Sequence, residues 1–193
     1  RRRKNVYLDE DGLRKMKKAT GLPASQQRAI DLSLLQFYMC GLNFKDVYYL
    51  RWEQLQNGRA FLERAKLGAH KYEFDMLLVP EAEEMIDKYK GKDSVYVFPW
   101  SKDDLRYKTF YDNHYRDLIK AQEKLEIETK PKRANLTTNV LRHTFSTLGK
   151  FKRVEDGIIR ELMNHEHKGM SAVYDDVYPE ADRDAAQRKI IRL

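Results

Sequence analysis

A chain of 193 residues has the length of one ordinary domain with a substantial hydrophobic core. Hydrophobic residues make up 41% and charged residues 35%, which is typical of a globular protein with a well-hydrated surface. No run approaches the roughly eighteen apolar residues of a membrane span, and the first residues lack a signal-peptide core. The formal net charge of +7 favours an anionic partner such as nucleic acid, although many unrelated basic proteins share it. The single cysteine, Cys40, lies in an apolar run and is predicted to be a buried free thiol, which is typical of a reducing compartment.

Apolar spacing predicts helices in the first part of the chain. Acidic residues from Asp9 onward favour the start of a helix that ends near Gly21. Residues 24–40 are predicted to form a long buried helix stopped by Gly41. Residues 43–52 are predicted to be a further helix.

A single hairpin is the only sheet that the sequence predicts with clear signals. The pair Asn57-Gly58 is a strong turn signal, and residues 59–65 and 71–77 are predicted to be two strands joined around Gly68. The later segments are predicted to be a helix at 80–90, a packed loop at 95–100, a helix at 108–125 and a charged connection at 126–135. The sequence therefore predicts a mainly α fold with one small antiparallel β-sheet.

Three residue types that suit attack on a phosphodiester follow one another in the last third of the chain. They are Arg142 in the segment LRHTFST, His165, and Tyr174 nine residues later. An arginine can hold phosphate oxygens, a histidine can donate or accept a hydrogen bond, and a tyrosine hydroxyl can be the nucleophile. A phenol with a pKa of about 10 needs nearby cations to activate it. Tyr178, four residues after Tyr174, is the alternative nucleophile.

The segments LRHTFST and MNHEHKGMSAVY resemble the tyrosine recombinases, the phage-integrase type of site-specific DNA recombinase. The usual family pattern is H-x-x-R-H-T-F-A-T, then L-G-H, then the nucleophilic tyrosine. The resemblance extends over most of the chain and implies the family's catalytic-core fold, which is mainly α with one small antiparallel β-sheet. It also implies double-stranded DNA as the partner, no cofactor, no membrane and no small-molecule substrate. The expected location is cytoplasmic, in a bacterium, and on the nucleoid when DNA is bound.

The same resemblance implies roles for four residues. Tyr174 is expected to attack the scissile phosphate, which forms a 3′-phosphotyrosyl bond and releases a 5′ hydroxyl. Arg142 and His165 are expected to contact the non-bridging oxygens. Lys66, in the predicted hairpin, matches the family lysine that protonates the leaving oxygen, and the alternative is an ordinary exposed hairpin lysine. A 5′ hydroxyl from a partner strand would then reverse the reaction.

Two positions depart from the family pattern. In the frame G-L-R-x-x-E the arginine is replaced by Asn43, while Asp46 occupies the acidic position. In H-x-x-R the histidine is replaced by Asn139, which shares a helix face with Arg142 and is still able to hydrogen-bond a phosphate. An amide does not titrate, so no proton transfer is expected there. In having a small polar residue, Asn43, in place of the first arginine, the chain resembles the family branch that conjugative and integrative elements carry.

The missing first arginine removes one cation from the expected phosphate site. Loss of one pre-organised donor typically costs a factor of about 10²–10³ in rate. Strand alternation predicts Arg64 on the same face as Lys66, so Arg64 is the first candidate for a replacement and Lys45 is the second. Lys45 is also expected to contact DNA.

Alternative interpretations apply to two further features of the motif region. Arg142 could instead be a buried arginine paired with a carboxylate such as Asp46. His143 is expected to support the site by packing beside it. No metal is expected, because His165 and His167 do not share a helix face and no further ligand is near in sequence.

The two ends of the chain carry separate expectations. The basic run Arg1, Arg2, Arg3 and Lys4 is expected to bind DNA, and the alternative is a solvated end. Residues 1–6 are expected to be an interdomain linker remnant and residues 7–193 the catalytic domain, with the family's N-terminal core-binding domain absent from this chain. Residues 185–193 resemble the tail that family members pass to a neighbouring subunit, which implies a homotetramer on DNA. The competing functions are a non-cleaving DNA-binding protein of the same fold and a type IB topoisomerase-like enzyme.

Overall fold

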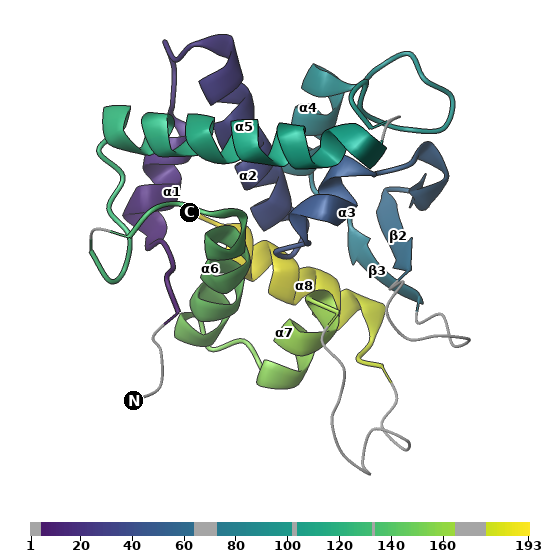
Figure 1. Ribbon diagram of the computed structural model, residues 1–193. Helices are drawn as coiled ribbons and strands as arrows, with labels where there is room; N and C mark the ends of the chain where they lie inside the picture. Colours follow the sequence, from purple (N-terminus) through teal and green to yellow (C-terminus); the bar gives the residue numbers. More distant parts are fainter. Residues whose placement is uncertain (1–4, 64–72, 102–103, 133, 165–176) are drawn as a thin grey trace.

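The computed structural model describes residues 5–63, 73–101, 104–132, 134–164 and 177–193, and the fold within them is mostly helical (Figure 1). The described helices are α1 (Glu10–Lys17), α2 (Ala24–Tyr38), α3 (Phe44–Tyr48), the 3-10 helix η1 (Trp52–Gln54), α4 (Pro80–Tyr89), α5 (Asp104–Lys124), α6 (Thr138–Phe151), α7 (Asp156–Leu162) and α8 (Glu180–Ile191). The described strands are β1 (Leu55–Gln56), β2 (Arg59–Glu63) and β3 (Glu73–Leu77). The predicted fold class, mainly α with one small antiparallel sheet, is confirmed.

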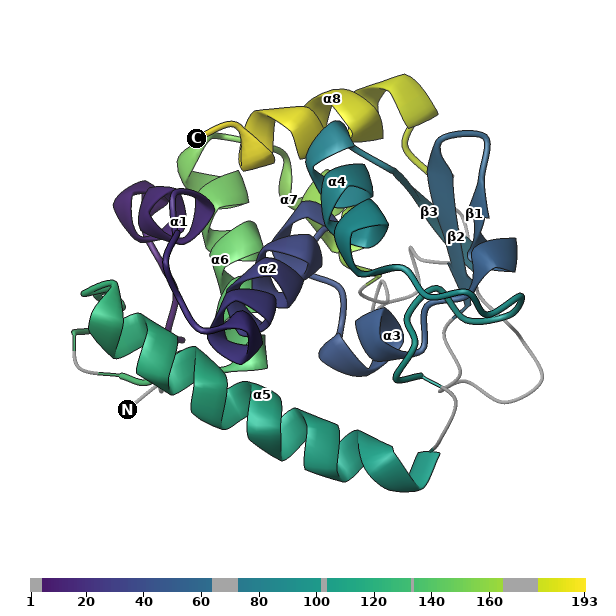
Figure 2. The same ribbon diagram turned by 90° about the horizontal axis from the view of Figure 1, so that it is seen from above.

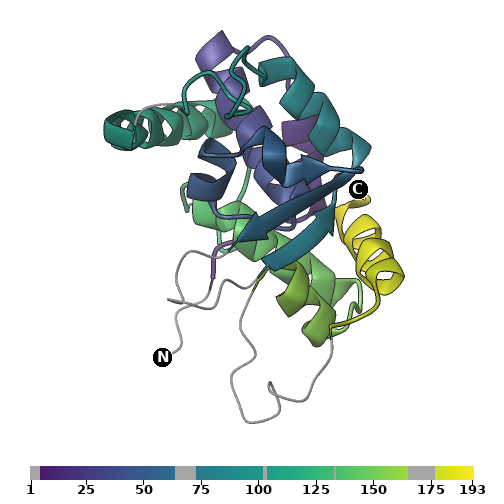
Figure 3. The same cartoon turned by 90° about the vertical axis from the view of Figure 1, so that its right-hand side faces the viewer.

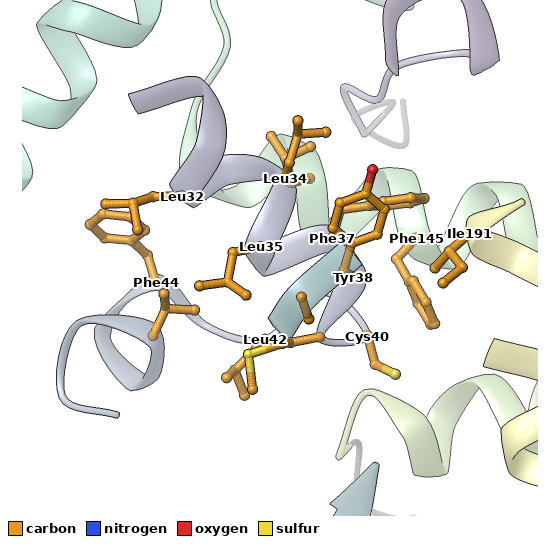
Figure 4. Close-up of a cluster of buried hydrophobic side chains, with 14 of the residues drawn as sticks. Leu32, Leu34, Leu35, Phe37, Tyr38, Cys40, Leu42, Phe44, Phe145 and Ile191 are labelled. Carbon is orange, nitrogen blue, oxygen red and sulfur yellow. The ribbon is translucent and has the colours of Figure 1, made fainter. Parts of the chain in front are cut away.

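Helix α2 is the centre of the fold, with α5, α4, α6 and α1 packed around it (Figure 2). Its side chains are buried almost continuously over its last three turns, as a helix surrounded by other elements requires. The close-up in Figure 4 shows Leu35 and Phe37 of this helix meeting Phe44, Phe145 and Ile191 from three other helices. The helix ends where Cys40 and Gly41 adopt φ values of 55° and 69°. The predicted buried free thiol of Cys40 is confirmed.

The three described strands form one antiparallel sheet in the order β1-β2-β3 (Figure 3). Asn57 and Gly58 both have positive φ, 52° and 72°, as the predicted hairpin turn requires. Strand β2 pairs with β3 from Arg59 opposite Leu77 to Glu63 opposite Glu73. The predicted connection between the two strands, around Gly68, lies in residues 64–72, outside the described residues. Strand β1 was not predicted.

The predicted helix at 43–52 is wrong in its second half. Helix α3 ends at Tyr48, and the chain then pairs with the loop at 95–97 instead of continuing the helix. The N–H of Val97 donates to the carbonyl of Leu50 at 2.9 Å, and the N–H of Trp52 donates to the carbonyl of Val95 at 3.0 Å. Backbone pairing with a segment more than forty residues away has overridden the local helical pattern. The 95–97 segment is therefore a packed loop, as predicted.

Helix α8 packs against its own chain, on α6, α7 and β3 (Figures 1 and 3). The side-chain amide of Gln187, fully buried, accepts from the N–H of Leu77 at 3.1 Å and donates to the carbonyls of Leu77 and Tyr38 at 2.9 and 3.0 Å. A charged network adds to these contacts: Arg59 of β2 binds both Asp75 of β3 and Asp184 of α8. No described helix is long and apolar enough to cross a membrane.

Candidate active site

A cleft of about 720 Å³ opens where the start of α3, the first half of α5, the start of α6 and the end of α7 meet. Its lining combines charged, amide and aromatic side chains. Among these are Asn43, Lys45, Asp46, Asn139, Arg142 and Asn164. The described residues of motifs that are far apart in the chain therefore line one cavity.

Arg142 ties three segments of the site together. One guanidinium nitrogen, Nη1, donates to the carbonyl of Gly41 at 2.7 Å, and Nη2 donates to the carbonyl of Met163 at 2.8 Å. These carbonyls belong to the turn after α2 and to the end of α7. Bonds to carbonyl oxygens orient a guanidinium and leave its positive charge in place, so the side chain can still attract an anion.

Gly41 is required by this arrangement for two reasons. Its φ of 69° is unfavourable for other residues, and a Cβ here would lie 3.0 Å from the Cα of Arg142. The glycine of the G-L-x-x-x-D frame thus lets the turn after α2 approach helix α6 closely. The position of Asn43 at the edge of the cleft follows from that approach.

The two asparagines that replace family residues both line the cleft. Asn139 is exposed in the first turn of α6, one turn before Arg142, so the expected shared face is confirmed. Asn43 is the N-cap residue of α3, yet its side chain makes no capping hydrogen bond there. Both amides are therefore placed to donate to a ligand in the cleft.

Lys45 and Asp46 occupy the first turn of α3 and line the same cleft. The ammonium of Lys45 is exposed and lies 5.9 Å from the ring centroid of Tyr49. The structure therefore brings the second candidate for the missing cation into the site. Arg64, the first candidate, lies outside the described residues.

An aromatic wall formed by Tyr49, Tyr107 and Tyr111 faces the cleft and was missed in the sequence. The hydroxyl of Tyr111 lies 3.3 Å from Oγ1 of Thr138, the first residue of α6. Burial, followed by the charge of Tyr111 and then of Asp46, raises the pKa of Tyr107 to about 12, so this hydroxyl stays protonated. Aromatic residues at helical spacing in α5 were the signal that could have revealed this wall.

His114 supports the site from behind. Its ring lies against Phe44 of α3, with the ring centroids 4.1 Å apart. Burial and then the nearby charge of Arg28 lower the pKa of His114 to about 3, so it is neutral at physiological pH. His143, the expected supporting histidine, is half-buried and does not line the cleft; burial and then Arg142 lower its pKa.

Several predicted functional residues lie outside the described residues. They are Tyr174, His165, Lys66, Arg64 and the run Arg1, Arg2, Arg3 and Lys4. Tyr178, the alternative nucleophile, is described: its hydroxyl donates to a carboxylate oxygen of Glu155. The part of the chain that the structure describes contains no group of three potential metal ligands, and the absence of a metal stays a prediction.

Comparison with known proteins identifies the family of this chain and its structural neighbours. The model of the phage integrase family matches residues 7–181, and the chain belongs to that family. Its fold is similar to the XerH site-specific recombinase in two solved complexes, a post-cleavage complex with palindromic difH and a pre-cleavage complex with difH. Each has a TM-score of 0.59 and 16% identity, with 83% of this chain covered. The match covers 46% and 47% of the two XerH chains, so this chain spans less than half their length. No curated protein matched the sequence.

Proposed function

We propose that this chain is the catalytic domain of a tyrosine-type site-specific recombinase that cuts and rejoins double-stranded DNA. The observation that carries the proposal is the cleft in which Arg142, Asn139 and Asn43 meet, in a chain of the phage integrase family. Arg142 is held from two sides and keeps its charge, which suits it to bind a phosphate. The N–H groups at the start of α6 add positive electrostatic potential at the same place.

The proposed reaction combines these cleft residues with Tyr174, His165 and Lys66. The hydroxyl of Tyr174 gives up its proton to solvent as its oxygen attacks phosphorus, the new O–P bond forms, and the bond to the 5′ oxygen breaks. Lys66 gives its proton to that leaving oxygen, while Arg142 and His165 hold the non-bridging oxygens, with Asn139 as a further donor. The energy of the broken ester is kept in the phosphotyrosine, so a 5′ hydroxyl can reverse the step without a cofactor.

We infer that this chain comes from the branch carried by conjugative and integrative elements, because Asn43 occupies the position of the family's first arginine. Asn43 supplies a hydrogen-bond donor and no charge, so we infer that a second cation comes from another residue. Lys45 is supported by its position in the cleft, and Arg64 by strand alternation with Lys66.

The rest of a working recombinase would surround this domain. Residues 1–6 would be the linker that follows a core-binding domain, and residues 7–193 the catalytic domain. Four subunits would act on two DNA duplexes in the bacterial cytoplasm, joined by exchange of the C-terminal segment. The site that α8 occupies on its own chain, on α6, α7 and β3, would then accept the same helix from a neighbour.

Mass photometry with two duplexes should show four protomers; a particle of one or two protomers contradicts the exchange.

A nicked suicide duplex tests the proposal, because loss of the short strand traps the covalent intermediate. The native domain should give a detergent-resistant protein–DNA adduct. Tyr174→Phe should give none, while it binds the same duplex with nearly unchanged affinity, since only a hydroxyl is removed. Binding without an adduct in the native domain would indicate the non-cleaving alternative, which the two altered motif positions favour. Relaxation of supercoiled DNA without strand exchange would indicate a topoisomerase-like enzyme.

A further inference from the structure

Helix α7 adjoins both ends of the segment that carries the proposed nucleophile. At its C-terminal end, the carbonyl of Met163 accepts the hydrogen bond from Arg142 at 2.8 Å. At its N-terminal end, Glu155 accepts a hydrogen bond from the hydroxyl of Tyr178. The chain therefore departs from α7 beside the cleft, and it returns to the same helix at Tyr178 before α8 begins.

Tyr178 is held at several points. Its backbone N–H donates to the carboxylate of Glu161, which is buried in α7, at 3.1 and 3.3 Å from the two oxygens. Its carbonyl accepts from Nε of Arg183 at 3.1 Å. Val177, the residue before it, is 59% exposed and provides a natural comparison.

Gly157 completes the contact by leaving room for the ring. A Cβ at this position would lie 2.6 Å from the Tyr178 hydroxyl oxygen and 2.9 Å from Cε2. The glycine lies in the first turn of α7, where its backbone is ordinary helix and does not require glycine. The absence of a side chain at Gly157 is therefore explained by the ring of Tyr178.

The number of residues between Tyr174 and each neighbouring fixed point, Asn164 and Tyr178, shows which of the two restricts its position more. Tyr174 precedes Tyr178 by four residues, which span at most about 14 Å when fully extended. Tyr174 follows Asn164 by ten residues, which span at most about 35 Å. Without the anchor at Tyr178, the tether would extend to the start of α8 at Glu180, a reach of about 20 Å. The constraint on the nucleophile thus comes from its C-terminal side.

We propose that Tyr178 is a positioning residue that α7 clamps, through Glu155, Gly157 and Glu161, so that the Tyr174 hydroxyl is kept within reach of the phosphate at Arg142. This inference rests on the proposed function. It also assigns Tyr178 a role other than that of alternative nucleophile. A misplacement of about 1 Å at a reacting atom can cost about a hundredfold in rate.

The test measures the rate of adduct formation in a single turnover on the suicide duplex, at saturating DNA, together with DNA affinity and thermal unfolding. Tyr178→Ala and Gly157→Ala should each slow the adduct by about tenfold to a hundredfold with DNA affinity within about twofold. Tyr178→Phe keeps the ring and should fall between these variants and the native domain. The control Val177→Ala should react at the native rate.

The double variant separates positioning from a general loss of structure. Gly157→Ala should add no further loss in a Tyr178→Ala background, because no ring is left to displace. Native rates in Tyr178→Ala and Gly157→Ala, with Tyr174→Phe inactive, would overturn the clamp and leave the proposed function intact. Reduced unfolding temperature or affinity with a native rate at saturating DNA would reduce Tyr178 to a structural residue. Adducts in Tyr174→Phe that disappear in Tyr178→Phe would make Tyr178 the nucleophile, which overturns the clamp and the assignment of Tyr174 but leaves DNA cleavage by this domain in place.

Discussion

Arg142 holds segments of the cleft together and is proposed to bind the phosphate, and the two roles can be separated by substitution. Lysine keeps the charge, but its single nitrogen cannot replace a planar guanidinium that donates to Gly41 and Met163 at once. Arg142→Lys should lower the free energy of unfolding by about 1–3 kcal/mol, as expected for an acceptor left unsatisfied. It should also slow adduct formation by a factor of about 10²–10³.

Urea unfolding and the suicide-duplex assay measure these two effects. Arg160→Lys is the matched control, because Arg160 is half-exposed and pairs with Asp156 on the surface; it should change the free energy of unfolding by less than about 0.5 kcal/mol. Native stability and rate in Arg142→Lys would show that the two carbonyl contacts and the cleft position are incidental.

The missing first arginine gives a second prediction at this scale. If Arg64 supplies the second cation, Arg64→Ala should slow cleavage by a factor of about 10²–10³ with little change in stability. Asn43→Arg in that background should restore part of the rate, because a guanidinium at this position would point into the same cleft. In the otherwise native domain Asn43→Arg should do little or be harmful, because two guanidinium groups would compete for one oxygen pair.

Lys45→Ala is the parallel measurement. A normal rate in Arg64→Ala and a slow rate in Lys45→Ala would assign the cation to Lys45, which lines the cleft beside Asn43. Normal rates in both would mean that Arg142 provides the positive charge alone or that the domain does not cut.

At the scale of elements, the charged network between β2, β3 and α8 should make the docking of α8 sensitive to acid. Burial alone would raise the pKa of Asp75, but the hydrogen bonds and charges of Arg183 and Arg59 outweigh it and hold the pKa below the usual 3.8. A carboxyl with a depressed pKa contributes stability that is present above its unfolded pKa and is lost as pH falls through the folded value. The contribution of Asp75 should therefore disappear as pH falls below about 4.

Unfolding curves between pH 7 and pH 2 check this, with Asp75→Asn as the comparison. The variant should be less stable at neutral pH and should lose less stability on acidification. Parallel curves for the two proteins would show that the ion pairs of Asp75 do not couple α8 to the sheet.

Sequence reasoning succeeded for elements whose signals are local. The buried pattern of α2 and the Asn57-Gly58 turn were sufficient, because neither depends on distant residues. It failed at 43–52, where pairing with the 95–97 loop replaced helix, and it gave no indication of β1. The partners of Arg142 could not be predicted, because they are backbone carbonyls brought together only by the turn at Gly41 and the end of α7.

At the scale of the whole molecule, the net charge of +7 predicts DNA binding that weakens steeply with salt. The slope of log K against log salt should be about −0.9 for each phosphate neutralised. Deleting residues 1–4 should flatten the slope if their cations contact the backbone, and leave it unchanged if the run is a solvated end. Replacing the four residues by serine is the control for the loss of chain length.

The central claim is that Tyr174 becomes covalently bonded to DNA, and peptide mapping of the trapped adduct tests it most directly. After nuclease and protease digestion, mass spectrometry should find a nucleotide phosphate on the peptide that contains Tyr174, with the label on Tyr174 itself. A nucleotide on Tyr178 or another tyrosine would contradict the assignment. The complete absence of a nucleotide-bearing peptide, in a domain that binds the duplex, would contradict the proposal that this chain cleaves DNA.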